Sequence, residues 1–195
     1  MIVYEIEGKA YINLTNKCSN ACTFCVRTTS DEYEPYSLWL TKEPTYEEVV
    51  DALQEYLDKC NEFVFCGYGE PLYRADMVEK VGKYLKSKNK YVRLNTNGQA
   101  DLICGEDISE RLVGAVDTVS ISLNEVTAKD YQTLCRCQFG EEGYASLLRF
   151  AKKCKEQNLR VVFSIVDILG KEKCEKAQEI ADGIGAELRI RELIK

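Results

Sequence analysis

The sequence predicts an α/β fold in which a mostly parallel sheet curls into part of a barrel and the helices lie outside it. Two observations lead to this prediction. The spacing of apolar residues switches repeatedly between about 2 and about 3.6, in alternating order along the chain, which is typical of repeated strand–helix units. The predicted strands also carry polar residues on one face, whereas parallel strands covered by helices on both faces are apolar almost throughout.

Six strands are predicted from segments rich in Val, Ile, Phe, Tyr or Thr. They are KAYINLT, EFVFCG, YVRLNTN, DTVSISLN, RVVFSIVD and AELRI, which begin at residues 9, 62, 91, 117, 160 and 186. Helices are predicted between them, over 44–60, over 76–88, around Tyr131, over 147–154 and over 174–184. The first of these opens with Thr45 and Glu48 in the spacing of a capping box.

The alternation within the strands indicates where a binding site lies. Ser120, Ser122 and Asn124 share one face of the fourth predicted strand, and Asn95 and Asn97 share one face of the third. A complete barrel has an interior packed with branched aliphatic side chains. We therefore expect a partial (β/α)6 TIM-like barrel, formed by one domain over residues 1–195, with a polar concave face that binds a ligand.

The composition and charge of the chain limit the chemistry that it can perform and the cell compartment in which it is expected. The 195 residues include ten cysteines and no histidine, so the commonest metal ligand and the usual general acid or base at neutral pH are missing. A net charge of −6 makes nucleic acid an unlikely partner. No apolar run is long enough to span a membrane, and Glu5 and Glu7 lie where a signal peptide would be apolar. A cytoplasmic protein with reduced thiols is expected.

Residues 26–44 form a long insertion between the cysteine-rich segment and the first predicted helix. It holds the only tryptophan, Trp39. Loops of this length are uncommon unless they are functional or disordered. Ordinary packing of Trp39 and Leu40 is favoured over a lid or a role in substrate recognition.

Three cysteines in the stretch NKCSNACTFC, Cys18, Cys22 and Cys25, directly follow the first predicted strand. Ligands of α/β sheets and barrels bind at this carboxyl end of the strands. Three thiolates hold three corners of a cubane iron–sulfur cluster, whose usual complement is four cysteines, and leave one iron open. A zinc site completed by Cys66, Cys135 or Cys137 is one alternative, and three unrelated buried thiols are another.

These motifs together resemble the radical S-adenosylmethionine (SAM) superfamily. The resemblance lies in the CxxxCxxC spacing with Phe24 before its last cysteine, in FCGYGEP at residues 65–71, in LNTNG after the third strand and in SISLN on the fourth. NLTNKCSNACTFC, LWL, FCGYGEP, RLNTNGQ and SLN…LCR resemble more narrowly the TatD-associated radical SAM proteins.

The resemblance implies a set of roles. Cys18, Cys22 and Cys25 would hold a [4Fe–4S] cluster, and SAM would chelate its open iron. The other implied contacts of SAM are Phe24 at the adenine, Gly67, Tyr68, Gly69 and Glu70 near the ammonium, Asn95, Asn97, Ser120, Ser122 and Asn124 at the ribose and carboxylate, and Arg136 at the carboxylate. Gly67 and Gly69 are also explained by a tight turn, and Ser120 and Ser122 by bonds to a neighbouring strand.

The implied chemistry is that of an oxidoreductase. A one-electron donor such as flavodoxin or ferredoxin reduces the cluster, SAM is cleaved to a 5′-deoxyadenosyl radical, and the radical takes hydrogen from a substrate. A peptide, protein or other macromolecule is favoured as substrate, because six units leave the barrel unsealed. A small metabolite such as a nucleotide is an alternative, as is a metal-binding module without turnover.

The other cysteines are expected to lie outside the single cluster. Cys60, Cys104, Cys154 and Cys174 have positions typical of core thiols. Cys66 lies at the mouth of the expected site, where strand packing is favoured over a radical relay.

Overall fold

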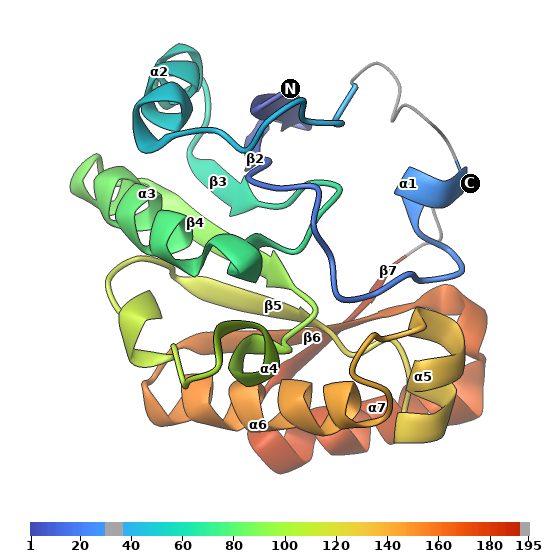
Figure 1. Cartoon of the computed structure of the whole chain (residues 1–195). Helices are drawn as coiled ribbons and strands as arrows, with labels where there is room; N and C mark the ends of the chain where they lie inside the picture. Colours follow the sequence, from blue (N-terminus) through green and yellow to red (C-terminus); the bar gives the residue numbers. More distant parts are fainter. Residues whose placement is uncertain (30–36, 192–195) are drawn as a thin grey trace.

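The computed structural model describes residues 1–29 and 37–191 of the chain. One seven-stranded sheet has the order β1-β2-β3-β4-β5-β6-β7 (Figure 1). Its strands are β1 (Val3–Ile6), β2 (Lys9–Ile12), β3 (Glu62–Phe65), β4 (Tyr91–Thr96), β5 (Thr118–Ser122), β6 (Arg160–Val166) and β7 (Glu187–Arg191). Strands β2 to β7 are parallel neighbours. The predicted curled α/β fold is confirmed.

The first strand was not predicted. β1 pairs antiparallel with β2 through a two-residue turn, Glu7 and Gly8, in which both residues have positive φ (51° and 73°). Positive φ at both central residues is the geometry of a type I′ hairpin turn, whose twist matches that of the flanking strands. Glu-Gly is a weaker signal for this turn than Asn-Gly or Asp-Gly, so the sequence did not reveal it.

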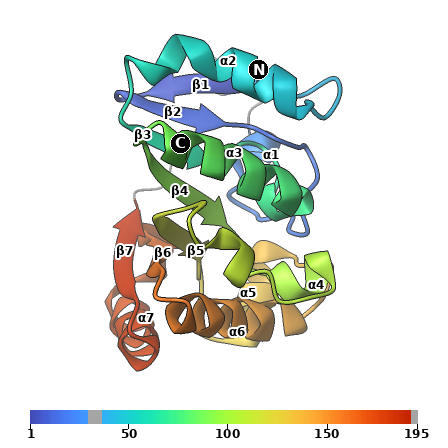
Figure 2. The same ribbon diagram turned by 90° about the vertical axis from the view of Figure 1, so that its left-hand side faces the viewer.

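The larger helices lie along the outer side of the curled sheet (Figures 1 and 2). The helices are α1 (Val26–Thr29), α2 (Tyr46–Leu57), α3 (Ala75–Ser87), α4 (Ala100–Cys104), α5 (Ala128–Cys135), α6 (Glu142–Glu156) and α7 (Lys171–Ile184), with 3-10 turns η1 (Pro71–Arg74), η2 (Glu110–Leu112) and η3 (Asp167–Leu169). The capping box of α2 is present: Glu48 N donates to Thr45 Oγ1 at 3.3 Å and Thr45 N donates to Glu48 Oε2 at 2.9 Å. No helix in these described ranges is long and apolar enough to cross a membrane.

The core lies between the sheet and these helices. Val119 and Ile121 of β5 are fully buried in it, as are Phe163 and Ile165 of β6. The alternate residues of the same strands point to the concave side. β5 therefore keeps its apolar residues for the helices and turns polar residues inward, whereas β1 and β2 carry Tyr4, Ile6 and Tyr11 in a second apolar cluster apart from this core.

The insertion at 26–44 is described only in part, because residues 30–36 of it lie outside the described residues. Trp39 contacts Tyr68 edge-on, with ring centroids 5.1 Å apart, yet 44% of its surface is exposed. Leu40 is half-buried, and its backbone N–H and carbonyl both bond the side chain of Asn16. The expectation of ordinary packing thus fits Leu40 better than Trp39.

Candidate active site

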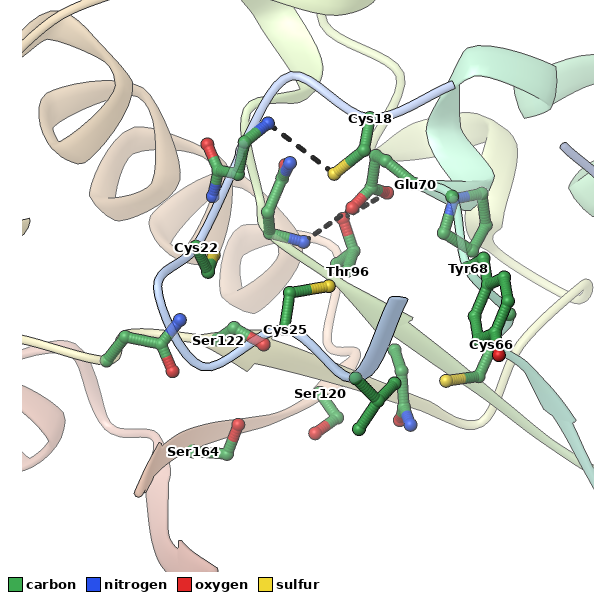
Figure 3. Close-up of a pocket in the computed structure, with 18 of the residues that line it drawn as sticks. Cys18, Cys22, Cys25, Cys66, Tyr68, Glu70, Thr96, Ser120, Ser122 and Ser164 are labelled. Atoms are coloured by element: carbon green, nitrogen blue, oxygen red, sulfur yellow. Dashed lines mark hydrogen bonds between the residues drawn. The ribbon is translucent and has the colours of Figure 1, made fainter. Parts of the chain in front are cut away.

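A cavity of about 310 Å³ lies at the carboxyl ends of the parallel strands. Its wall combines the three cysteines of the loop after β2 with residues from the ends of β3 to β7 (Figure 3). All the site residues expected from the sequence line this cavity except Arg136. The motifs, which are up to about a hundred residues apart, therefore meet in one place.

The cysteine loop has almost no secondary structure of its own, and other segments hold it in place. Ala21 N donates to Cys135 O at 2.9 Å and Thr23 N donates to Leu134 O at 3.0 Å, so the loop rests on the carboxyl-terminal end of α5. On its other side, Glu70 N donates to Lys17 O at 2.8 Å. These backbone bonds satisfy groups that a regular strand or helix would otherwise pair.

Arg27 fixes the loop from within. Its guanidinium group donates to the carbonyl oxygens of Asn16 at 3.2 Å, Asn20 at 3.1 Å and Tyr68 at 3.5 Å. One planar cation with several donors thereby joins both ends of the cysteine loop to the loop after β3.

A buried polar network joins the loop to β4 and α5. The Asn20 Nδ2 and Gln99 Nε2 atoms both donate to the Tyr131 hydroxyl at 2.9 Å, and Gln99 Nε2 also donates to Asn20 Oδ1 at 2.9 Å. Asn97 Nδ2 donates to Ser19 Oγ at 2.8 Å. Satisfied buried networks of this kind impose a single arrangement, because an unpaired member is costly in a low-dielectric interior.

Glu70 is buried at the junction of β3 and β4. Its carboxylate accepts hydrogen bonds from Thr96 Oγ1 at 2.7 Å and from Asn97 N at 2.7 Å, at the centre of the cavity wall (Figure 3). It also accepts one from Leu72 N at 3.0 Å. Burial raises the pKa of this carboxyl group to about 7, although the three hydrogen bonds act in the opposite direction. A carboxylate has about four acceptor sites, so Glu70 joins the two strand ends and retains room for one further donor.

The three thiols are half-buried and unoxidised. Burial raises the pKa of Cys18, to about 12, and that of Cys25. A hydrogen bond with Cys135, together with burial, raises the pKa of Cys22. In residues 1–29 and 37–191, no three Cys, Asp or Glu side chains converge to hold a single metal ion. A closed zinc site needs four ligands around one ion, whereas the thiolates of a cubane cluster bind separate irons and need not converge.

The profile of the Radical SAM superfamily matches residues 12–182 of the chain. The chain belongs to the radical SAM superfamily. No curated protein matches it in sequence.

Solved structures with the same fold include radical SAM enzymes. SuiB of Streptococcus suis bound to S-adenosylmethionine superposes with a TM-score of 0.68 at 16% identity, covering 95% of this chain and 38% of SuiB. A radical SAM methyltransferase from Sphaerobacter thermophilus gives 0.69 at 15% identity, covering 97% and 57%. The FeFe-hydrogenase maturase HydG from Carboxydothermus hydrogenoformans gives 0.68 at 16% identity, covering 96% and 44%. At these identities the likeness shows the fold alone, and this chain spans 38–57% of the length of those proteins.

The radical SAM cofactors, a [4Fe–4S] cluster and SAM, fit the groups that the cavity offers. The Oδ1 atoms of Asn95 and Asn124 are buried without a hydrogen-bond partner. The hydroxyl groups of Ser120 and Ser122 form no hydrogen bond with the part of the chain that the structure describes, so they are not used to satisfy a neighbouring strand. The cavity wall therefore holds free acceptors and hydroxyls suited to ribose and amino-acid groups.

The two glycines of the FCGYGEP segment line the cavity and are also needed for packing within the chain. A Cβ on Gly67 would lie 2.1 Å from Asn13 Oδ1, and one on Gly69 would lie 2.2 Å from Thr15 O. The space of the missing side chains is thus filled by the residues that follow β2, at the start of the cysteine loop. Glycine is required here so that this loop can pack against the end of β3.

Arg136 does not lie where its expected contact with the SAM carboxylate would place it. It is the exposed C-cap residue of α5, with a φ of 46°, and it does not line the cavity. Its neighbour Cys135 is buried behind the cavity wall, where Asn124 Nδ2 donates to Cys135 Sγ at 3.5 Å.

Several cavity residues were missed by sequence reasoning, and the missed signal was strand alternation. Ser164 on β6 is on the same side as Ser120 and Ser122, and Arg189 and Arg191 alternate with Leu188 and Ile190 on β7. The alternation used for β5 applies equally to these strands. Asn20 and Thr96 have no such pattern, since loop contacts and a tertiary hydrogen bond place them.

The remaining thiols near the cavity face different partners. Cys137 Sγ donates to Gln99 Oε1 at 3.4 Å, away from the cavity wall. Cys66 lines the cavity at the end of β3; burial raises its pKa, and a hydrogen bond with Asn95 partly offsets that rise.

Proposed function

We propose that this chain is a radical SAM enzyme that reductively cleaves SAM at a [4Fe–4S] cluster and abstracts hydrogen from a substrate bound in the cavity. Cys18, Cys22 and Cys25 would hold the cluster. The observation that carries the proposal is that these three thiols and the polar face of β4, β5 and β6 line one cavity at the carboxyl ends of the strands.

When bound, the cluster and SAM supply the one-electron chemistry, so the protein has to bind, orient and exclude water. Arg27 and the Asn20–Gln99–Tyr131 network would keep the cysteine loop in one shape. Glu70 would use its remaining acceptor site for the SAM ammonium. Ser120, Ser122, Asn95 and Asn124 would bind the ribose and carboxylate groups.

The proposed substrate is a peptide, protein or other macromolecule. β1 and β7 each pair with one strand only in the described sheet, so the sheet does not close around the cavity. SuiB, which shares the fold, has been solved with a precursor peptide bound. The narrower proposal that the chain is a TatD-associated radical SAM protein rests on its motifs, and a flavodoxin or ferredoxin is the proposed electron donor.

The test is SAM turnover by the anaerobically reconstituted and dithionite-reduced protein. 5′-Deoxyadenosine is measured by chromatography, beside iron and zinc content. Cys18→Ala is expected to abolish both bound iron and deoxyadenosine, because the cluster loses a ligand. Cys154→Ala removes a fully buried thiol of α6 and serves as the matched control.

Cluster-dependent deoxyadenosine in the wild type and in Cys154→Ala, but not in Cys18→Ala, is the expected result. Zinc bound without any SAM cleavage would instead make this chain a structural metal-binding module. Equal iron loss in both variants would contradict the assignment of the ligands.

A further inference from the structure

The cavity wall carries a surplus of positive charge. Arg93 on β4 and Arg189 and Arg191 on β7 line it, whereas its single acidic residue is Glu70. Glu70 already accepts three hydrogen bonds from other groups. A chain with a net charge of −6 thus concentrates cations on the inner face of its barrel.

The arginines of the barrel interior differ in whether they are paired. Arg93 Nε lies 3.0 Å from Glu62 Oε1, and Arg160 pairs with both carboxylate oxygens of Glu187 at 2.8 and 2.7 Å. Within residues 1–29 and 37–191, Arg189 and Arg191 have no carboxylate partner, and the buried Arg191 Nε has no hydrogen-bond partner at all. Both of these guanidinium groups belong to β7, an edge strand of the described sheet.

Two neighbouring guanidinium groups without a counter-ion are an unfavourable arrangement. Burial lowers the pKa of Arg191, and the charge of Arg189 lowers it further, yet a guanidinium remains protonated at any physiological pH. A bound anion would relieve this repulsion. Guanidinium groups bind carboxylate and phosphate through two parallel hydrogen bonds, which favours these anions over others.

The two arginines lie at different heights on the inner face of β7. A second cavity, of about 490 Å³, is lined by Arg189 together with the first residues of β3 to β7, at the end of the strands opposite to the cysteines. Arg189 lines both cavities, whereas Arg191, the last residue of β7, lines only the cavity that holds the cysteines. In the strand register Arg189 lies opposite Ser164, which lies opposite Ser122, so a ligand bound by the pair would lie beside the serines of β5 and β6.

We propose that Arg189 and Arg191 bind a carboxylate or phosphate group of the substrate and so hold the substrate in the barrel beside the SAM site. This inference rests on the proposed function for the identity of the reaction. It adds the chemical class of the substrate: a molecule, or a residue of a macromolecule, that carries at least one negative charge. SAM also carries a carboxylate, so the test has to distinguish the two sources of the anion.

The test is calorimetric titration of the anaerobic, cluster-containing protein with sodium phosphate and with sodium acetate, each with and without saturating SAM. Arg189→Gln and Arg191→Gln are expected to weaken binding of the better probe at least tenfold. Lys152→Gln removes one positive charge from an exposed position of α6 and is expected to leave the affinity for that probe unchanged. SAM affinity and iron content are expected to be the same in all four proteins.

Three results would overturn the inference. The first is that the wild type shows no affinity for either anion. The second is that Lys152→Gln weakens binding as much as the arginine variants do. The third is that the anion binds only without SAM and the arginine variants lose SAM affinity, which would assign the pair to the SAM carboxylate. Arg191→Lys, which keeps the charge but not the planar fork, provides a folded comparison if a Gln variant is unstable. SAM cleavage by the wild type is independent of all three results, so the proposed function can stand when the inference fails.

Discussion

The substitution Gly69→Ala tests whether the end of β3 shapes the cysteine loop. A Cβ at this position would lie 2.2 Å from Thr15 O and 2.6 Å from Lys17 O, and Cβ contacts below 3.0 Å essentially never occur. The loop backbone would therefore have to retreat by about 0.8 Å, which also strains the hydrogen bond from Glu70 N to Lys17 O. Overpacking costs roughly 1–3 kcal/mol and a lost hydrogen bond about 1 kcal/mol more.

This strain is expected to act on cluster binding. If the metal-free loop relaxes and the loaded loop cannot, a cost of about 2–4 kcal/mol weakens cluster retention by roughly 30- to 700-fold. The measurement is iron per polypeptide and the brown cluster absorbance after anaerobic reconstitution and exposure to a chelator.

Two further glycines provide matched controls. A Cβ on Gly82 of α3 would lie 2.4 Å from Ala115 O, so Gly82→Ala is expected to lower the free energy of unfolding without altering iron content. Gly183 of α7 has open space around it, and Gly183→Ala is expected to stabilise the protein by up to about 1 kcal/mol through helix propensity. If Gly69→Ala retains its cluster as well as Gly183→Ala does, the steric reasoning about the loop is refuted.

Two other predictions concern the site. Ser122→Ala and Asn124→Ala should each weaken SAM binding while iron content is unchanged, because both residues offer free polar atoms to the cavity; unchanged SAM affinity in both would show that the polar face does not bind SAM. Tyr131→Phe removes the hydroxyl that accepts bonds from Asn20 and Gln99, so the free energy of unfolding should fall by about 1–3 kcal/mol in a urea titration. An unaltered urea midpoint would mean that water replaces the hydroxyl.

Much of the fold followed from strand alternation. The contrast between Val119 and Ser120 indicated a sheet with one apolar and one polar face, and the structure has that arrangement. The hairpin strand β1 was missed because it has only four residues, too few for a clear alternation, and because its Glu-Gly turn is an uncommon hairpin sequence. Strand alternation predicted the faces correctly where one face of the sheet packs on helices, because each position on that buried face then requires an apolar residue.

The site was less accessible from the sequence. The order of the motifs placed the three cysteines, the FCGYGEP segment and the serines in one cavity. The hydrogen bonds of Glu70 to Thr96 and Asn97 join residues 26 and 27 positions apart, and no local pattern encodes such a pairing. Arg136 does not line the cavity, and its neighbour Cys135 contacts the cavity residue Asn124.

The network around the cysteine loop has a consequence for the order of events during synthesis. Asn20 and its partner Tyr131 are 111 positions apart, and Ser19 and Asn97 are 78 apart. The ribosome therefore releases the three cysteines long before it makes the residues that hold their loop. A cluster delivered to the nascent chain would encounter three thiols on a loop that still lacks its hydrogen-bond partners. If the three cysteines hold the cluster as proposed, their loop would reach its final shape only after α5 has docked, and cluster insertion is expected to follow folding.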